Sequence, residues 1–142
     1  MSVYALTSGT LKIDEHLIDS IELKSLREQI SYVPQDVFLF SDTILNNILF
    51  GNENATIEKA FDATKSAGIF DEIMSFPEGF KTVIGERGIT LSGGQKQRFS
   101  IATTLINQPK IIFLDEPTTG LDPQARRNLW DLIKEIRNNG TT

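Results

Sequence analysis

Two stretches decide the fold of this chain: Leu91-Ser92-Gly93-Gly94-Gln95, and the apolar run Ile111-Ile112-Phe113-Leu114 that ends in Asp115-Glu116. The first is typical of a helix start, because Ser92 can cap the first turn while Gln95 reaches back to it. The second indicates a strand that ends in two adjacent carboxylates. Because this strand is apolar at every position, we expect it to lie in a parallel sheet with both faces covered.

The residue types in these stretches favour binding of an anion and of a ligand at a sheet edge. Two adjacent glycines let a backbone approach a ligand closely, and free N–H groups at a helix start attract negative charge. Asp115 and Glu116 follow the carboxyl end of a strand, where open α/β sheets bind ligands. On an extended backbone they point to opposite faces and can have different tasks. A simple capping box, and an acid that caps the next helix, remain alternatives at this point.

The composition limits the class of protein. The chain has 142 residues, of which 39% are hydrophobic and 23% are charged, as expected for one globular domain. The net charge is −5 and there is no basic run, so we expect no nucleic-acid partner. The lack of cysteine excludes disulfides and thiolate metal sites. His16 has no second histidine nearby, and we interpret it as a solvated side chain. We see neither a membrane-spanning run nor a signal peptide.

Glycine and proline residues divide the chain into alternating elements. Strands are predicted over residues 10–14, 29–33 and 111–114, and a short helical turn over residues 23–27. Helices are predicted over residues 43–50, 57–67, 69–76 and 95–108, with a last helix that starts at Pro123, has Asp122 as its N-cap and closes at Gly140. This order predicts an α/β fold with a helical insertion.

In these motifs and their order, the chain resembles the ATP-binding cassette (ABC) ATPases. Residues 91–95 resemble the signature motif and residues 111–116 the Walker B motif, Ser31-Tyr32-Val33-Pro34-Gln35-Asp36 resembles the Q-loop, and Thr119-Gly120-Leu121-Asp122 the D-loop. The resemblance implies one partial nucleotide-binding domain over residues 1–142. Residues 1–35 and 96–142 would form parts of a P-loop NTPase core. Residues from about 36 to 95 would form a helical subdomain with the signature motif at its end.

The resemblance also implies a role for each site residue. Asp115 would hold Mg²⁺ through water, and Glu116 would polarise the water that attacks ATP. Gln35 would sense both the Mg²⁺ and the γ-phosphate. We therefore expect it to act both as a catalytic residue and as a metal-binding residue. ATP held by the opposite protomer would meet Leu91, Ser92, Gly93, Gly94, Gln95 and Asp122. The implied cofactors are therefore ATP and Mg²⁺.

The implied function is ATP hydrolysis that drives transport across a membrane. Residues 38–51 follow the exporter pattern, so we expect an exporter. Its partners would be a transmembrane domain and a second nucleotide-binding domain in a head-to-tail dimer, at the cytoplasmic face of the membrane. The apolar side chains of residues 38–48 would either belong to the core of the helical subdomain or meet the transmembrane partner. Residues 9–91 resemble half-transporters, and those from Gln95 onward resemble stand-alone export subunits.

One motif that this chemistry requires does not occur in the 142 residues. There is no Gly-x-x-x-x-Gly-Lys-Ser/Thr, whose backbone N–H groups and lysine hold the β- and γ-phosphates. Thr7-Ser8-Gly9-Thr10-Leu11 matches a family segment just downstream of that cradle, and the switch histidine of the family would follow Thr142. We therefore expect the chain alone to be inactive. Three alternatives stay open: a fragment that completes a partner's ATP site in trans, a soluble ABC ATPase acting on ribosomes or DNA, and a fragment without independent function.

Overall fold

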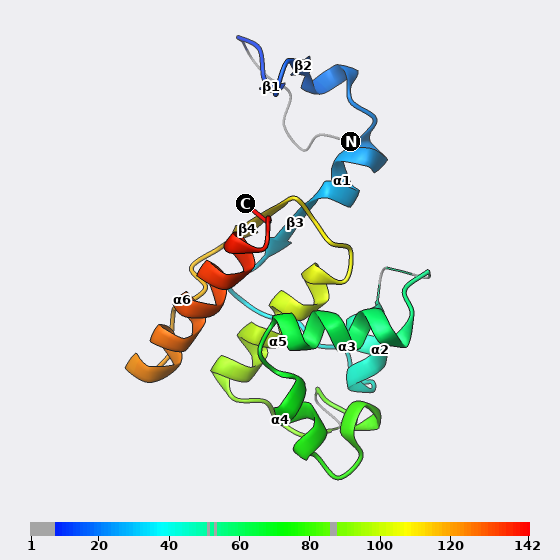
Figure 1. Ribbon diagram of the computed structural model, residues 1–142, viewed down its shortest axis with the longest axis vertical. Coiled ribbons are helices and arrows are strands. Elements are labelled where there is room, and N and C mark those ends of the chain that lie inside the picture. The colour runs from blue at the N-terminus through cyan, green and yellow to red at the C-terminus, as the bar shows by residue number, and fades with distance from the viewer. Residues whose placement is uncertain (1–7, 51, 53, 86–87) are drawn as a thin grey trace.

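The computed structural model describes residues 8–50, 52, 54–85 and 88–142. Figure 1 shows a small hairpin at one end of the molecule, helix α1 between this hairpin and a two-stranded sheet, and helices around a central helix α5. The described elements are, in chain order, β1 (Lys12–Ile13), β2 (His16–Leu17), η1 (Ile18–Ser20), α1 (Leu23–Gln29), β3 (Ile30–Val33), α2 (Ile44–Leu49), α3 (Ile57–Ser66), α4 (Phe70–Ser75), η2 (Gly79–Lys81), α5 (Gly93–Leu105), β4 (Ile111–Leu114) and α6 (Pro123–Asn138). None of the described helices has the length and apolar character needed to cross a membrane.

The central sheet is formed by β3 and β4, which pair in parallel as predicted. Tyr32 lies beside Phe113 and Val33 beside Leu114. The amide of Asp115 donates to the carbonyl of Val33 at 3.0 Å, which extends the pairing one residue past β4. On the other edge of β4, the amide of Ile112 donates to the carbonyl of Thr142 at 2.7 Å. β4 is therefore hydrogen-bonded on both edges.

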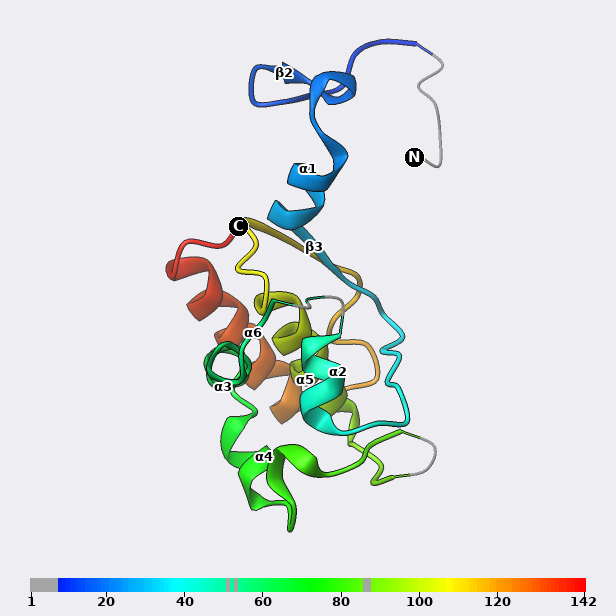
Figure 2. The ribbon, with the colours of Figure 1, turned by 90° about the vertical axis from the view of Figure 1, so that its right-hand side faces the viewer.

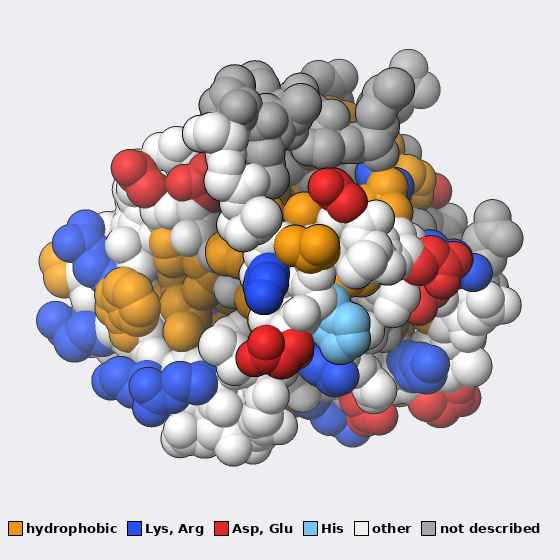
Figure 3. Space-filling model, turned by 90° about the horizontal axis from the view of Figure 1, so that it is seen from above, with side chains coloured by type: hydrophobic (Ala, Val, Ile, Leu, Met, Phe, Trp, Pro, Cys, Tyr) orange, Lys and Arg blue, Asp and Glu red, His pale blue; other side chains and the backbone are white. Residues whose placement is uncertain are grey.

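Only one face of this sheet is well covered. Ile112 and Leu114 face a small cavity between β4, α5 and α6, whereas Tyr32 and Phe113 on the other face are each 56% exposed. The prediction that residues 111–114 are buried on both faces is therefore wrong, because the described elements cover the second face only in part. Figure 3 shows hydrophobic side chains open to solvent on the face of the molecule seen from above.

The helical part and the sheet share one hydrophobic core. It runs from Val33 on β3 through Ile44 and Ile48 on α2 to Leu129 on α6. Phe99 and Ile101 on α5 are almost completely buried at its centre. In Figure 1, α2 and α3 lie on one side of α5 and α6 lies on the other, while Figure 2 shows α2 and α3 on opposite sides of α5. Because α5 packs on α2, α3, α6 and β3, it connects the helical insertion to the sheet.

Polar caps set where several helices begin. The hydroxyl of Thr43 accepts from the amide of Asn46 at the start of α2, and Thr56 does the same for the amide of Lys59 at the start of α3. The predicted helix over residues 95–108 instead runs from Gly93 to Leu105, because the cap at Ser92 starts it earlier. The predicted strand over residues 10–14 is only two residues long and forms an antiparallel hairpin with β2.

Candidate functional site

The side chain of Glu116 receives two hydrogen bonds, one from a distant part of the chain and one from the turn that follows it. Nε2 of Gln35, just after β3, donates to Oε2 of Glu116 at 3.3 Å. The hydroxyl of Thr119 donates to the same oxygen at 3.0 Å, and the Thr119 amide donates to the Glu116 carbonyl at 3.0 Å. Within the described residues no other group bonds this carboxylate, so its Oε1 can accept from a water or a ligand.

Asp115 has a different partner. The hydroxyl of Tyr32 donates to Oδ2 of Asp115 at 2.6 Å. The hydrogen bond that Tyr32 donates to Asp115 raises the pKa of the Tyr32 phenol. Desolvation and the negative charge of Asp115 act in the same direction. We call Tyr32, Gln35, Asp115, Glu116 and Thr119 the carboxylate cluster. It lies where β3 and β4 both end.

The backbone between the two acids departs from the predicted extended form. β4 ends at Leu114, and Glu116 has a φ of 42°. A positive φ is uncommon for a residue with a side chain and often occurs at functional sites. The prediction that an extended backbone points Asp115 and Glu116 to opposite faces is therefore wrong. The two acids have different partners because the chain turns sharply after Asp115.

The oxygen donors here fit a magnesium ion that is shared with a substrate. In the part of the chain that the structure describes, no three His, Cys, Asp or Glu side chains gather into a protein-only metal cage. Mg²⁺ keeps several waters and is held by one or two carboxylates plus substrate phosphates. Asp115 is exposed, as are Gln35 and Glu116. The set therefore fits Mg²⁺ only together with phosphate oxygens.

The turn that starts α5, which we call the signature turn (residues 91–95), forms the predicted capping box. Ser92 Oγ accepts from the Gln95 amide at 3.2 Å, and Gln95 Oε1 accepts from the Ser92 amide at 2.8 Å. Leu91 is buried, whereas Ser92 and Gly93 are exposed. The backbone N–H groups of an exposed helix start can bind an anion. The capping box is therefore compatible with a ligand role.

The signature turn lies against the start of α6. A Cβ added at Gly93 would be 3.4 Å from a methyl group of Leu121, and one added at Gly94 would be 3.6 Å from Cβ of Ala125. Gly94, Leu121 and Asp122 line a shallow hollow of about 250 Å³. The structure thus joins the predicted signature and D-loop residues at one place. Among the described residues, Gly94, Leu121 and Asp122 share no hydrogen bond with Asp115 or Glu116, whereas Thr119 of the same predicted D-loop bonds Glu116.

Asp122 is the N-cap of α6, as predicted. Its Oδ1 accepts from the amides of Gln124 and Ala125, both at 2.9 Å. The bond from the Ala125 amide is the main cause that lowers the pKa of this carboxyl, and Gln124 and the charge of Arg127 act in the same direction. The side chain is exposed. Its predicted contact with ATP stays a prediction.

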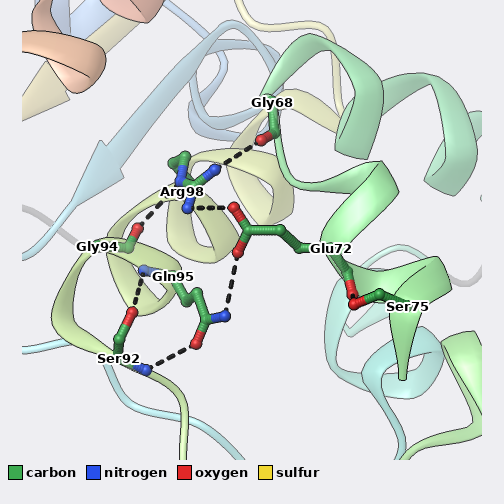
Figure 4. Close-up of polar contacts among 7 residues, drawn as sticks. All are labelled: Gly68, Glu72, Ser75, Ser92, Gly94, Gln95 and Arg98. Atoms are coloured by element: carbon green, nitrogen blue, oxygen red, sulfur yellow. Dashed lines mark hydrogen bonds and ion pairs between the residues drawn. The ribbon is translucent and has the colours of Figure 1, made fainter. Parts of the chain in front are cut away.

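A third cluster ties the signature turn to α4. Gln95 Nε2 donates to Oε2 of Glu72 at 3.0 Å, and Arg98 pairs with Oε1 of Glu72 at 2.6 Å (Figure 4). Arg98 also donates to the carbonyl of Gly68 at 2.8 Å and to that of Gly94 at 3.3 Å. Sequence reasoning missed Glu72 and Arg98 as partners, since nothing in their spacing shows that α4 packs beside α5.

Sequence reasoning placed Tyr32 and Thr119 in motif segments but did not predict that they bond the two acids. A signal was present for each. Thr119 follows Glu116 by three residues, the spacing that closes a tight turn. Tyr32 lies two residues before Pro34 at the predicted strand end, so it could reach an acid at the end of a neighbouring parallel strand.

Three phenylalanines form an exposed aromatic surface beside α2. The rings of Phe38 and Phe40 are 5.0 Å apart edge to face, and those of Phe40 and Phe50 are 4.3 Å apart. Phe38 is 76% exposed, so these rings lie at the surface, whereas Ile44 and Ile48 of the same segment are completely buried in the core. The apolar residues of this segment are therefore divided between the two predicted alternatives. The buried Asn47 holds the loop behind the rings, because its side chain accepts from the Phe40 amide and donates to the carbonyls of Phe40, Asp42 and Thr43.

Comparison with known proteins identifies many relatives. The family model described as "ABC transporter" matches residues 1–119. An uncharacterized ABC transporter ATP-binding protein of Bacillus subtilis (strain 168), YfiB, is 48% identical over 131 residues, which are 92% of this chain and 23% of the relative. A putative multidrug export ATP-binding/permease protein of the same organism, YgaD, is 45% identical over 139 residues, which are 98% of this chain and 24% of that relative.

A solved structure gives the same result for the fold. It is described as a bacterial Atm1-family ABC exporter with ATP bound, and the match has a TM-score of 0.82 at 39% identity. The match covers 98% of this chain and 24% of the solved one. The chain therefore spans about a quarter of the length of these proteins.

Proposed function

The chain belongs to the ABC transporter family, and on that premise we propose that it is part of a nucleotide-binding domain whose ATP hydrolysis drives export. The observation that carries this proposal is the Glu116 carboxylate. Gln35 of the Q-loop and Thr119 of the D-loop both bond its Oε2. One oxygen is thereby anchored and the other can accept a proton from an attacking water, as a general base requires.

We assign the remaining roles from the same geometry. Asp115 would hold Mg²⁺ through water with Oδ1, because Oδ2 is bonded by Tyr32. Gln35 would report the presence of Mg²⁺ and the γ-phosphate to Glu116. Bound Mg²⁺ would neutralise the charge that develops on the phosphates. The signature turn and Asp122 would face ATP held by a second nucleotide-binding domain.

The proposed membrane partner is a transmembrane domain that contacts Phe38, Phe40 and Phe50. Exposed aromatic clusters are frequent in protein interfaces, and the relative YgaD is described as an ATP-binding/permease protein. Such docking would place the domain at the cytoplasmic face of the membrane. Replacing Phe38 with serine in the intact transporter should uncouple transport from hydrolysis while ATP still binds.

A second candidate function is favoured by the signature turn. This turn is capped by its own residues, and Ser92 and Gly93 at its start are exposed. The 142 residues hold no phosphate cradle of their own. The chain could therefore complete the ATP site of a partner domain in trans. ATP-dependent binding of this chain to an intact domain would distinguish that function from an inactive fragment.

The test of the main proposal is Glu116→Gln in the intact protein. Loss of a general base should reduce hydrolysis by about 10²–10⁴-fold while ATP still binds, so the protein should accumulate as a nucleotide-bound dimer. Glu135→Gln is the matched control, since Glu135 is exposed on α6. Near-normal turnover in Glu116→Gln would exclude Glu116 as the base.

A further inference from the structure

Glu72 on α4 lies where two side chains of α5 converge. Its Oε2 accepts from Gln95 and its Oε1 is paired with Arg98. Arg98 uses its other N–H groups on the carbonyls of Gly68, at the end of α3, and of Gly94, at the start of α5. Figure 4 shows the guanidinium between these three groups. One ion pair therefore connects three helices.

This pair fixes the orientation of the Gln95 amide. Gln95 Oε1 accepts from the Ser92 amide, while Nε2 is held by Glu72. Both ends of the amide are thus engaged, and the capping box cannot relax by rotating it. Because Arg98 also holds the Gly94 carbonyl, the backbone of the signature turn is tied to α4 at two points.

The pair also controls charge beside the turn. A lone carboxylate at this position would oppose the anion that a helix start attracts. Arg98 neutralises Glu72, and the side chains are only 26% and 38% exposed, respectively, so solvent screens the pair in part. Removing Arg98 alone would leave a negative charge hydrogen-bonded to Gln95.

We propose that Glu72 and Arg98 are positioning residues that hold the signature turn, in shape and in charge, for the phosphates of a nucleotide carried by a second domain. The proposal rests on the proposed function, because only that function brings a nucleotide to the turn. Neither residue touches the reacting atoms.

The first experiment uses the 142-residue chain and no nucleotide. Amide hydrogen exchange is compared in the wild type, Glu72→Ala and Asp71→Asn. The amides of Gln95 and Lys96 bond to Ser92, and in Glu72→Ala they should exchange about five- to tenfold faster. Asp71 is the matched control, an exposed neighbour on the same helix, and its variant should leave both rates unchanged. Equal rates in all three proteins would overturn the positioning role.

The second experiment measures ATP affinity in the intact protein with Glu116→Gln, which prevents turnover. Arg98→Gln should weaken binding about tenfold, and adding Glu72→Gln should recover at least threefold of that loss, because the unpaired charge is then gone. A purely structural pair would give a double variant no better than Arg98→Gln. That result would overturn the charge argument.

Two further readouts keep the outcomes separate. If Arg98→Gln fails to fold by circular dichroism, Arg98→Lys replaces it, and it should bind ATP within about threefold of the wild type because it keeps the charge. Tenfold weaker binding by a folded Arg98→Lys would contradict the charge argument. If the intact wild type binds no ATP, the proposed function fails, while the exchange rates still decide whether Glu72 positions the turn.

Discussion

The hydroxyl of Tyr32 donates a 2.6 Å hydrogen bond to Oδ2 of Asp115, a residue 83 positions further along the chain. The bond connects the end of β3 to the end of β4 at the site where the acids gather. It occupies one oxygen of Asp115 and leaves Oδ1 without a hydrogen bond from the described residues. Tyr32 therefore orients the carboxylate that we assign to Mg²⁺.

Asp115→Asn should lower the pKa of Tyr32 toward its ordinary value of about 10. The hydrogen bond to Asp115 is the largest cause that raises the pKa of the Tyr32 phenol, followed by desolvation and by the charge of Asp115. Because the folded pKa is raised, the stabilisation is present below pH 10 and is lost as the pH rises through the folded pKa. Carbon-13 NMR of the tyrosine ring would measure the shift, with Tyr32→Phe to assign the signal. An unchanged pKa in Asp115→Asn would disprove the contact.

The chain of 142 residues should bind MgATP weakly and should not hydrolyse it. The physical reason is the missing phosphate cradle, which normally holds the β- and γ-phosphates, and not a defect in Asp115 or Glu116. Calorimetric titration and a phosphate-release assay would measure both properties. Turnover that Glu116→Gln abolishes would contradict this expectation and would require another phosphate site in the chain.

Asn47→Ala should destabilise the fold by about 2 kcal/mol, because it leaves buried backbone groups without partners. Asn47 is buried and accepts from the Phe40 amide at 2.8 Å, while it donates to the Phe40 carbonyl at 3.0 Å. Urea unfolding would measure the free energy of unfolding. Asn46→Ala is the control, since Asn46 is exposed and should cost less than about 1 kcal/mol. Equal effects would show that the loop does not depend on Asn47.

Asp122→Asn should flatten the acid dependence of stability. The amides of Ala125 and Gln124 lower the pKa of the Asp122 carboxyl. Its stabilisation is therefore present above the unfolded pKa of about 3.9 and is lost as the pH falls through the folded value. Asparagine caps a helix without titrating, so this variant should lose less stability below pH 4. Thermal unfolding at a series of pH values would measure this effect. At pH 7, Asp122→Ala should have a lower Tm than the wild type and Asp122→Asn. Parallel pH curves for aspartate and asparagine would contradict it.

Hydrogen exchange should be slower in the helical part than in β4. Ile48 and Phe99 lie in the shared core, whereas Phe113 is half exposed on the open face of the sheet. Open apolar surface reduces the free energy of local opening. The expected result is earlier exchange at Phe113 and Leu114 than at Phe99. Equal protection, with one sharp thermal transition of a monomer, would show that the sheet needs no further cover.

Local features could be predicted from the sequence because they depend on neighbours three or four residues apart. The capping box of Ser92 and Gln95 and the N-cap at Asp122 have this property, and both form as expected. The parallel pairing of β4 also follows from its apolar composition. Its burial on both faces does not, since burial depends on which elements lie on each side.

The partners of the functional side chains were decided by the tertiary structure. Gln35 meets Glu116 across 81 positions, and Tyr32 meets Asp115, because β3 and β4 are in register and end together. Gln95 meets Glu72 because α4 packs beside the start of α5. The sequence by itself determined which chemical groups are present and how each helix starts. Only the packing of distant elements decided which groups touch, since contact across a fold depends on register and helix placement.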